Sequence, residues 1–174
     1  MIRRPPRSTQ SRSSAASDVY KRQSYGGYSV FYLAGVHQKR FKAFIAHNGM
    51  FNLESFYAGT EETFFPNHDF GGPYWDKDNK VAQRTYANSP HKLVQNWDTP
   101  IMIIVGENDF RIPYPEGLQA FNAAQLRNIP SRLLVFPDET HFVSTPCLLY
   151  TSDAADDLLC VDLGGRRIIT KKTQ

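Results

Sequence analysis

Two continuous apolar runs, each ending at a polar loop, most constrain how this 174-residue chain can fold. The first is residues 101–105 (IMIIV), which Gly106 ends, and the second is the LLVF part of the expected strand 132–136 (RLLVF), which Pro137 ends. Such runs are typical of strands that are buried on both faces of a sheet. Helical patterns precede and separate them. We therefore expect an α/β fold, with a parallel sheet and right-handed crossovers.

The other elements follow from apolar spacing, caps and turn residues. Asn52 and Ser89 are the expected N-caps of two helices. Residues 59–79 have no clean period and hold Pro and Gly among aromatic residues, which predicts one long irregular loop. The remaining expected elements are a strand at 41–46 and helices at 27–38, 52–57, 81–87, 90–96 and 115–127.

Both ends of the chain read as translated sequencing-adapter DNA. A coding sequence permitted for residues 13–23 is complementary, in another frame, to one permitted for residues 147–156, and the outermost segments are related in the same way. Selection on a protein produces no inverted repeat of this kind, whereas library preparation does. We therefore interpret residues 1–23 and 147–174 as adapter-derived and expect one partial domain over residues 24–146.

The charge of the chain belongs largely to these ends. The formal net charge is +3, but residues 24–146 hold more acidic than basic side chains. The basic balance is therefore no evidence for a nucleic acid or an anionic membrane, and we expect neither as a partner. No apolar run approaches the roughly 20 residues that cross a bilayer. No His, Cys, Asp or Glu spacing resembles a zinc site, so we expect no cofactor and no metal.

Three loops hold a serine, an aspartate and a histidine in that chain order. Ser24 opens the first helix, whereas Asp109 and His141 follow the two apolar runs. Because parallel strands end at one edge of a sheet, we expect these side chains to meet there. A serine hydroxyl becomes nucleophilic when an imidazole takes its proton and a buried carboxylate orients that imidazole. The order is that of α/β-hydrolases, in which the N–H after the nucleophile, here of Tyr25, stabilises the oxyanion.

Other residues compete for two of these roles. Asp98 lies before its strand, at the wrong edge of the sheet, and His47 ends a strand near the expected cleft. Taken alone, the Ser-Tyr-Gly-Gly segment is most often a turn, so the interpretation depends on the combined order and loop positions. The full set of alternatives is Asp98, Glu107 and Asp138 for the carboxylate, and His37, His47, His68 and His91 for the imidazole.

Four short motifs follow one another along residues 24–146: SYGGY, RFKA, GExDxR and ExH. Together they resemble the catalytic domain of the prolyl oligopeptidase family of serine peptidases, in its dipeptidyl-peptidase and acylaminoacyl-peptidase-like branch. The resemblance implies the C-terminal portion of an α/β-hydrolase parallel sheet with flanking helices, the first half of the sheet being missing. It also implies a triad of Ser24, Asp109 and His141 that hydrolyses peptide bonds through an acyl-enzyme.

The resemblance further implies substrate contacts and another domain. Arg111 matches an arginine that holds a substrate carbonyl, and Met50, Leu53 and Phe56 fall where the family lines its primary specificity pocket. A structural ion pair for Arg111 and a plain core role for the other three are the alternatives. The implied partner is a peptide substrate, and the implied parent has an N-terminal β-propeller. We expect this chain to be a fragment that is inactive alone; an esterase of the same fold and a truncated chain without catalysis are the other hypotheses.

Overall fold

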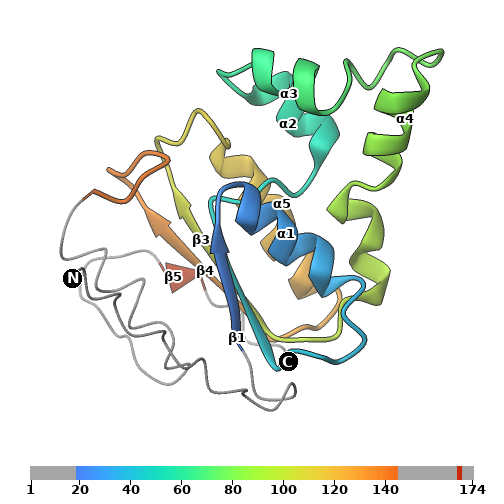
Figure 1. Cartoon of the computed structure of the whole chain (residues 1–174). Coiled ribbons are helices and arrows are strands. Elements are labelled where there is room, and N and C mark those ends of the chain that lie inside the picture. Colours follow the sequence, from blue (N-terminus) through green and yellow to red (C-terminus); the bar gives the residue numbers. More distant parts are fainter. Residues whose placement is uncertain (1–18, 145–167, 170–174) are drawn as a thin grey trace, which may run out of the picture.

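The computed structural model, which describes residues 19–144 and 168–169, has a parallel sheet at its centre (Figure 1). Its strands pair in chain order, and the short β5 (Ile168–Ile169) runs antiparallel beside β4. This arrangement confirms the α/β class and the parallel sheet predicted from the apolar runs. The parallel strands are β1 (Val19–Gln23), β2 (Ala43–His47), β3 (Ile101–Gly106) and β4 (Ser131–Phe136).

Two helices, α1 (Tyr25–Ala34) and α5 (Tyr114–Leu126), cover one face of this sheet (Figure 1). Phe31 and Phe121 from these helices pack with the inward side chains of β2, β3 and β4 in the largest core cluster. Side chains of the same strands that point the other way form a second cluster, with Ile104 and Phe136 among its members. Because successive strand residues alternate between the faces, a strand that contributes to both clusters has apolar residues at consecutive positions.

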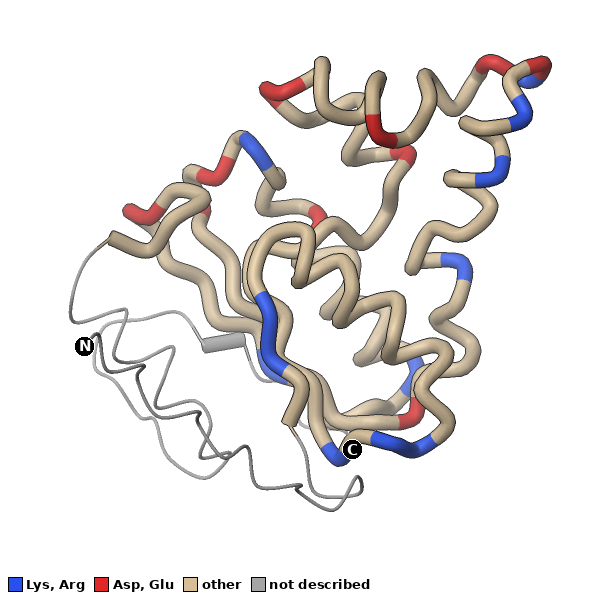
Figure 2. The backbone as a smooth tube through the Cα atoms, viewed as in Figure 1, with Lys and Arg blue, Asp and Glu red and all other residues tan. Residues whose placement is uncertain are grey.

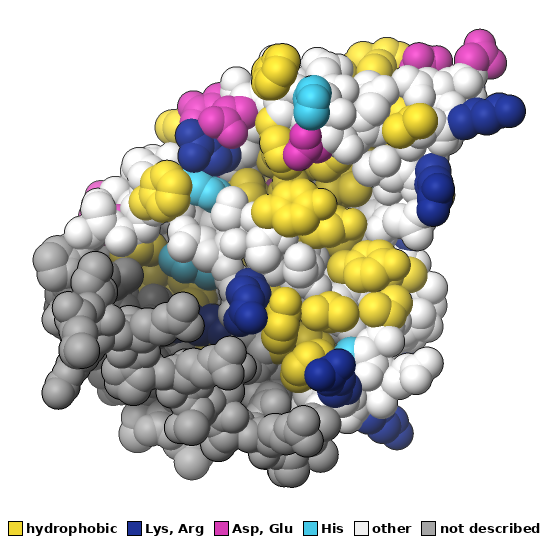
Figure 3. Space-filling model, in the orientation of Figure 1, with side chains coloured by type: hydrophobic (Ala, Val, Ile, Leu, Met, Phe, Trp, Pro, Cys, Tyr) yellow, Lys and Arg dark blue, Asp and Glu magenta, His cyan; other side chains and the backbone are white. Residues whose placement is uncertain are grey.

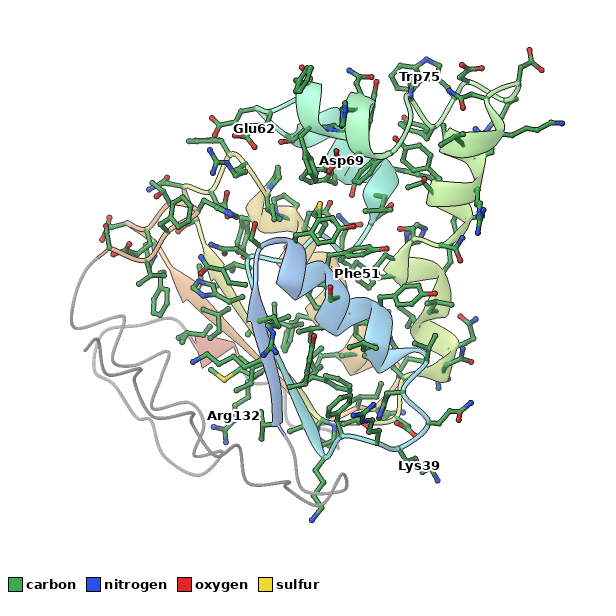
Figure 4. The ribbon with its side chains drawn as sticks, viewed as in Figure 1. Lys39, Phe51, Glu62, Asp69, Trp75 and Arg132 are labelled. Atoms are coloured by element: carbon green, nitrogen blue, oxygen red, sulfur yellow. The ribbon has the colours of Figure 1, made fainter. Side chains whose placement is uncertain are left out.

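A small lobe lies above the edge where the strands end (Figure 1). It has its own aromatic and aliphatic core. Figure 4 shows Glu62, Asp69 and Trp75 on the lobe, whereas Lys39 and Arg132 lie at the opposite edge, where β2 and β4 begin. The lobe consists of α2 (Leu53–Gly59), α3 (Phe64–Asp69) and α4 (Lys80–Ala87). The 3₁₀ helix η1 (Pro90–Asn96), which follows α4, packs against α1.

The lobe contains one element that sequence periodicity did not predict. Helix α3 lies within residues 59–79, which were expected to form a single irregular loop. The ring of Phe65 packs edge-on against Phe56 and Phe70, with centroids 6.2 and 5.7 Å away. Tertiary packing of this kind stabilises a helix too short to be stable from local propensity alone.

Strand β1 lies in a segment that we set aside as adapter-derived. Val19–Gln23 pairs with Ala43–His47 in parallel register. Main-chain hydrogen bonds between strands require no particular side chains, so an extended segment of almost any sequence can occupy this edge. The assignment of both ends to adapter DNA, and the domain limits drawn from it, remain predictions. Residues 1–18, 145–167 and 170–174 lie outside the described part of the chain.

Charged residues are unevenly distributed along the described part of the backbone (Figure 2). Many acidic residues lie on the lobe and along the edge where the strands end, whereas basic residues are frequent along the segment of α4 and η1 and where the strands begin. A helix suited to spanning a bilayer is not found between residues 19 and 144.

Candidate active site

Ser24 occupies a sharp turn between the last residue of β1 and the first residue of α1. Its backbone angles are φ 59° and ψ −126°, a region that is costly for a residue with a Cβ atom. The N–H of Ser24 donates to the carbonyl of His47 at 3.0 Å, and its own carbonyl accepts from Tyr28 at 3.1 Å. A strained strand-to-helix turn of this form exposes a nucleophile at the edge of a hydrolase sheet.

Two glycines let α1 approach this turn closely. A Cβ atom on Gly26 would lie 2.8 Å from Cβ of Arg22, and one on Gly27 would lie 2.7 Å from Cα of Gly49. Both distances are too short for real contacts, so these positions require glycine as long as their neighbours stay in place. Arg22 stands two residues before Ser24, where the G-x-S-x-G turn of hydrolases has its first glycine.

The side chains of Ser24, His141 and Asp109 form a continuous hydrogen-bonded chain. Nε2 of His141 lies 2.9 Å from Oγ of Ser24, and its Nδ1 lies 2.8 Å from Oδ2 of Asp109. The other carboxylate oxygen of Asp109 accepts the N–H groups of Arg111 and Ile112, at 3.0 and 2.8 Å. Since a carboxylate only accepts, Nδ1 carries the proton and Nε2 accepts from the serine hydroxyl. The structure thus brings the three predicted residues together.

Burial of the carboxylate and imidazole strengthens this arrangement. Asp109 is 2% exposed and His141 is 6% exposed. A charge-assisted hydrogen bond is stronger where water is excluded. The structure places most of the competing candidates elsewhere. Asp98 pairs with His37 across 3.4 Å, and Nδ1 of His91 contacts the hydroxyl of Ser89.

His47 is the competing histidine that lies near the triad. It is 6% exposed at the end of β2, and its Nε2 has no hydrogen-bond partner. The pKa of His47 is lowered from 6.5 to about 4, mainly by burial and to a smaller extent by electrostatic interaction with the neighbouring imidazole of His141. His47 is therefore neutral at the pH where a serine hydrolase works.

Tyr25, the expected oxyanion donor, is the first residue of α1. The first N–H groups of a helix have no acceptor within the helix and are therefore available to a ligand. The N–H of Tyr25 thus lies immediately after the serine and is oriented by the helix that begins there. The geometry allows it to stabilise a negative oxygen beside Ser24.

A pocket of about 500 Å³ opens between α1 and the lobe. Tyr25 and Tyr28 line it from the α1 side, and Met50 and Leu53, predicted from the resemblance, line it from the lobe. Phe56 does not line it: this ring is 2% exposed in the lobe core, packed behind Phe70 with centroids 5.9 Å apart. Figure 3 shows hydrophobic side chains gathered at this junction between lobe and sheet domain.

Arg111 lies on the loop after Asp109 and has an ionic partner. Its guanidinium is 2.7 Å from Oε1 of Glu62, and both side chains are partly exposed. The face of the Phe142 ring lies 5.8 Å from the guanidinium carbon. The ion pair that the sequence left open as an alternative is therefore present, and a substrate carbonyl would share the guanidinium with Glu62.

Sequence reasoning missed two residues that support the site. The side chain of Asn48 bridges the loops of Asp109 and His141, and the buried carboxylate of Glu116 binds the start of α2. An Asn-Gly pair after a strand predicts only a turn. A single glutamate in the first turn of a helix predicts only a favourable charge at that end. Neither sequence pattern predicts that the side chain makes a buried tertiary contact.

Residues 23–153 match the model of the prolyl oligopeptidase family. The chain belongs to this family. It is 65% identical over 123 residues to dipeptidyl-peptidase 5 of Porphyromonas gingivalis and 55% identical over 123 residues to that of Porphyromonas endodontalis. Each comparison covers 71% of this chain but only 18% of the relative.

Solved structures show the same fold at lower identity. The acylaminoacyl peptidase of Pyrococcus horikoshii matches with a TM-score of 0.61 and 21% identity, over 70% of this chain and 19% of that one. A puromycin-hydrolyzing peptidase of Mycobacterium tuberculosis matches with a TM-score of 0.68 and 20% identity, over 78% of this chain and 20% of that one. The fold is a C-terminal portion of an α/β-hydrolase sheet with flanking helices, as the sequence predicted.

Proposed function

We propose that this chain carries the catalytic triad of a serine peptidase, with Ser24 as nucleophile, His141 as general base and Asp109 as orienting carboxylate. The observation that carries the proposal is the hydrogen-bonded chain from Ser24 through His141 to Asp109, which starts at a strained turn. Three residues from separate loops, far apart in sequence, have the distances and burial that acyl transfer requires.

The mechanism follows from these contacts. Ser24 Oγ attacks the peptide carbonyl carbon while its proton passes to Nε2 of His141. Asp109 stabilises the resulting imidazolium, and the N–H of Tyr25 binds the negative oxygen of the tetrahedral intermediate. His141 then gives the proton to the leaving amine, and the carbonyl carbon stays bonded to Ser24. Water, deprotonated by His141, hydrolyses this ester and restores the serine.

The substrate of the longer protein is a peptide in this proposal. The names of the most similar relatives favour removal of dipeptides, and the resemblance adds an N-terminal β-propeller to the parent. Met50 and Leu53 would contact the side chain next to the cleaved bond, and Arg111 would hold a substrate carbonyl. The chain spans 18% of its relatives' length, so we propose that it is inactive on peptides by itself. The reactivity of Ser24 in this chain can still be tested separately from peptide hydrolysis.

A fluorophosphonate probe tests the reactive serine in this chain directly, because the probe needs only an activated hydroxyl. We expect one adduct, located on Ser24 by peptide mass mapping and lost in Ser24→Ala. Ser29→Ala, which removes a second hydroxyl from the same helix, is the matched control and should label normally. If circular dichroism shows a folded chain that is unlabelled, or is labelled at another residue, the result would support the hypothesis of a truncated chain without catalytic activity.

Peptide and ester substrates distinguish the two enzymatic hypotheses in the longer protein. For a peptidase, Ser24→Ala should reduce kcat on a dipeptide amide by about 10⁶-fold, as loss of a triad serine does elsewhere. An esterase would cleave only the matched ester, with no measurable amide hydrolysis before or after the substitution.

A further inference from the structure

Asn48 lies where the chain leaves β2, in a backbone conformation that few residues adopt. Its φ is 43°, and the residue is 1% exposed. Its side-chain oxygen accepts the N–H of Gly106 at 3.0 Å, and its side-chain nitrogen donates to the carbonyl of His141 at 2.9 Å. One amide group therefore uses both its acceptor and a donor on backbone groups of two different loops.

These two loops carry the aspartate and the histidine of the triad. Gly106 ends β3, and its carbonyl accepts the N–H of Asp109 at 3.3 Å. The loops are also in close contact with each other, because the N–H of Asn108 donates to the carbonyl of Glu139 at 3.1 Å. Asn48 thus reaches both loops at the point where they meet, from the strand next to that of the nucleophile.

The carbonyl of His141 has a second donor on the nucleophile strand. Nε2 of Gln23, the residue before Ser24, donates to it at 2.9 Å. A carbonyl oxygen has two lone pairs and can accept both bonds. The main chain of the histidine is therefore fixed from the end of β1 and from the loop after β2, whereas its imidazole spans Ser24 and Asp109.

We propose that Asn48 is a positioning residue, which acts through the main chain of Gly106 and His141 to keep the imidazole in line between serine and aspartate. The proposal rests on the triad assigned above. An asparagine amide suits this position for two reasons. It tolerates positive φ better than other side chains with a Cβ atom, and it offers a donor and an acceptor on one planar group.

Two substitutions separate the side chain from the backbone conformation. Glycine at position 48 adopts the same φ without strain, so Asn48→Gly removes only the bridging amide. Asn48→Asp keeps the acceptor for Gly106 and loses the donor to His141. Asn128 is the matched control, because it also has positive φ, 55°, but it is exposed in the turn after α5. Asn128→Gly changes the same residue type at the same kind of backbone position.

The test uses the whole chain and two measurements: the rate of fluorophosphonate labelling as a function of pH, and the proton NMR signal of His141 Nδ1–H. Displacing a catalytic group by about 1 Å can reduce a rate by about 10²-fold. We expect Asn48→Gly and Asn48→Asp to label about 10-fold or more slowly than wild type, with a shifted pH midpoint and a broadened imidazole signal. Asn128→Gly should match wild type in both measurements.

The outcomes distinguish this inference from the proposed function. If wild type labels and Asn48→Gly labels at the same rate with an unchanged imidazole signal, Asn48 has no positioning role. If wild type does not label but its imidazole signal is present and broadens only in the Asn48 variants, the peptidase proposal fails and the positioning role stands. A thermal melt of each variant shows that loss of the native fold does not cause the rate change.

Discussion

At the scale of single residues, His47 shows how burial near the triad affects stability. Its imidazole is buried at the end of β2, and its pKa is lowered to about 4. The unfolded chain binds this proton below about 6.5, whereas the folded chain binds it only below about 4. The unfolded state therefore binds more protons between these values, and the free energy of unfolding rises with pH through this window.

The prediction is a loss of stability as the pH falls from 6.5 to 4. His47 contributes about 3 kcal/mol to this loss, from the free energy equivalent of its pKa shift. The variant His47→Gln, which has no titrating group, should show a correspondingly flatter dependence. Urea denaturation at a series of pH values measures it. Equal slopes for both proteins in this window would contradict the burial of a neutral imidazole.

Gly26 and Arg22 form a pair whose coupling can be measured. A Cβ atom at position 26 would lie 2.8 Å from Cβ of Arg22, so Gly26→Ala alone should cost about 1–3 kcal/mol through overpacking. Arg22→Gly removes the clashing atom. In that background the same alanine should cost much less, with a coupling free energy of at least about 1 kcal/mol. Additive effects in the double-mutant cycle would show that the turn has room for both side chains.

The residues of the proposed triad could be picked out from sequence, whereas the residues that support them could not. Ser24, Asp109 and His141 are residue types with known chemistry, and each opens a helix or lies in the loop after a predictable strand. Asn48 and Glu116 act through backbone groups that lie near them only in the folded chain. Phe56 was expected to line the specificity pocket, but it is buried in the lobe core. A residue that is close in sequence to pocket-lining residues can still point away from the pocket.

At the scale of elements, one buried carboxylate holds the start of α2 against α5. Glu116 accepts the N–H groups of Phe51 and Asn52, at 2.9 and 2.7 Å, and the hydroxyl of Ser55. Burial raises the pKa of the Glu116 carboxyl, although these three bonds oppose the effect. The segment between Met50 and Leu53, both of which line the pocket, is thereby fixed to a helix that packs on the sheet.

Removing this carboxylate should destabilise the lobe. Glu116→Ala leaves the N–H groups of Phe51 and Asn52 without this acceptor, whereas the hydroxyl of Ser55 can still donate to the carbonyl of Asn52. Because each lost acceptor costs about 1–3 kcal/mol, we expect a loss of about 2 kcal/mol or more. The exposed carboxylate of Glu107 is the matched control, and Glu107→Ala should change stability by less than about 0.5 kcal/mol. Chemical denaturation measures both. A loss below about 1 kcal/mol for Glu116→Ala would contradict this role.

The strands and most helices could be predicted from apolar pattern, but helix α3 and the packing contacts within the lobe could not. Continuous apolar runs identify β3 and β4, because strands buried on both faces lack polar positions. Helix α3 depends on ring contacts of Phe65 within the lobe, which no local period encodes. Ser89 is the N-cap residue of η1, as expected, but its hydroxyl makes no capping hydrogen bond. The hydroxyl accepts the N–H of Leu53 at 3.0 Å and so links the start of α2 to the segment after α4.

At the scale of the whole molecule, the described residues bring the three side chains of the proposed triad together on part of a hydrolase sheet. The three side chains follow β1, β3 and β4, which belong to one sheet, with β2 between β1 and β3. The hydrogen bonds that join the side chains lie within the described residues. The acyl-transfer mechanism of α/β-hydrolases also uses a second oxyanion N–H, which comes from a loop in the first half of their sheet. Activation of the serine and turnover of a peptide can therefore be measured separately.

The most direct test of this account is the rate at which a fluorophosphonate modifies Ser24 in wild type and in His141→Gln. Without the imidazole that accepts its proton, the serine hydroxyl is a weak nucleophile, so we expect the rate to fall by at least about 100-fold while the protein stays folded. An unchanged rate in His141→Gln, or an adduct on a residue other than Ser24, would contradict the assignment of the triad.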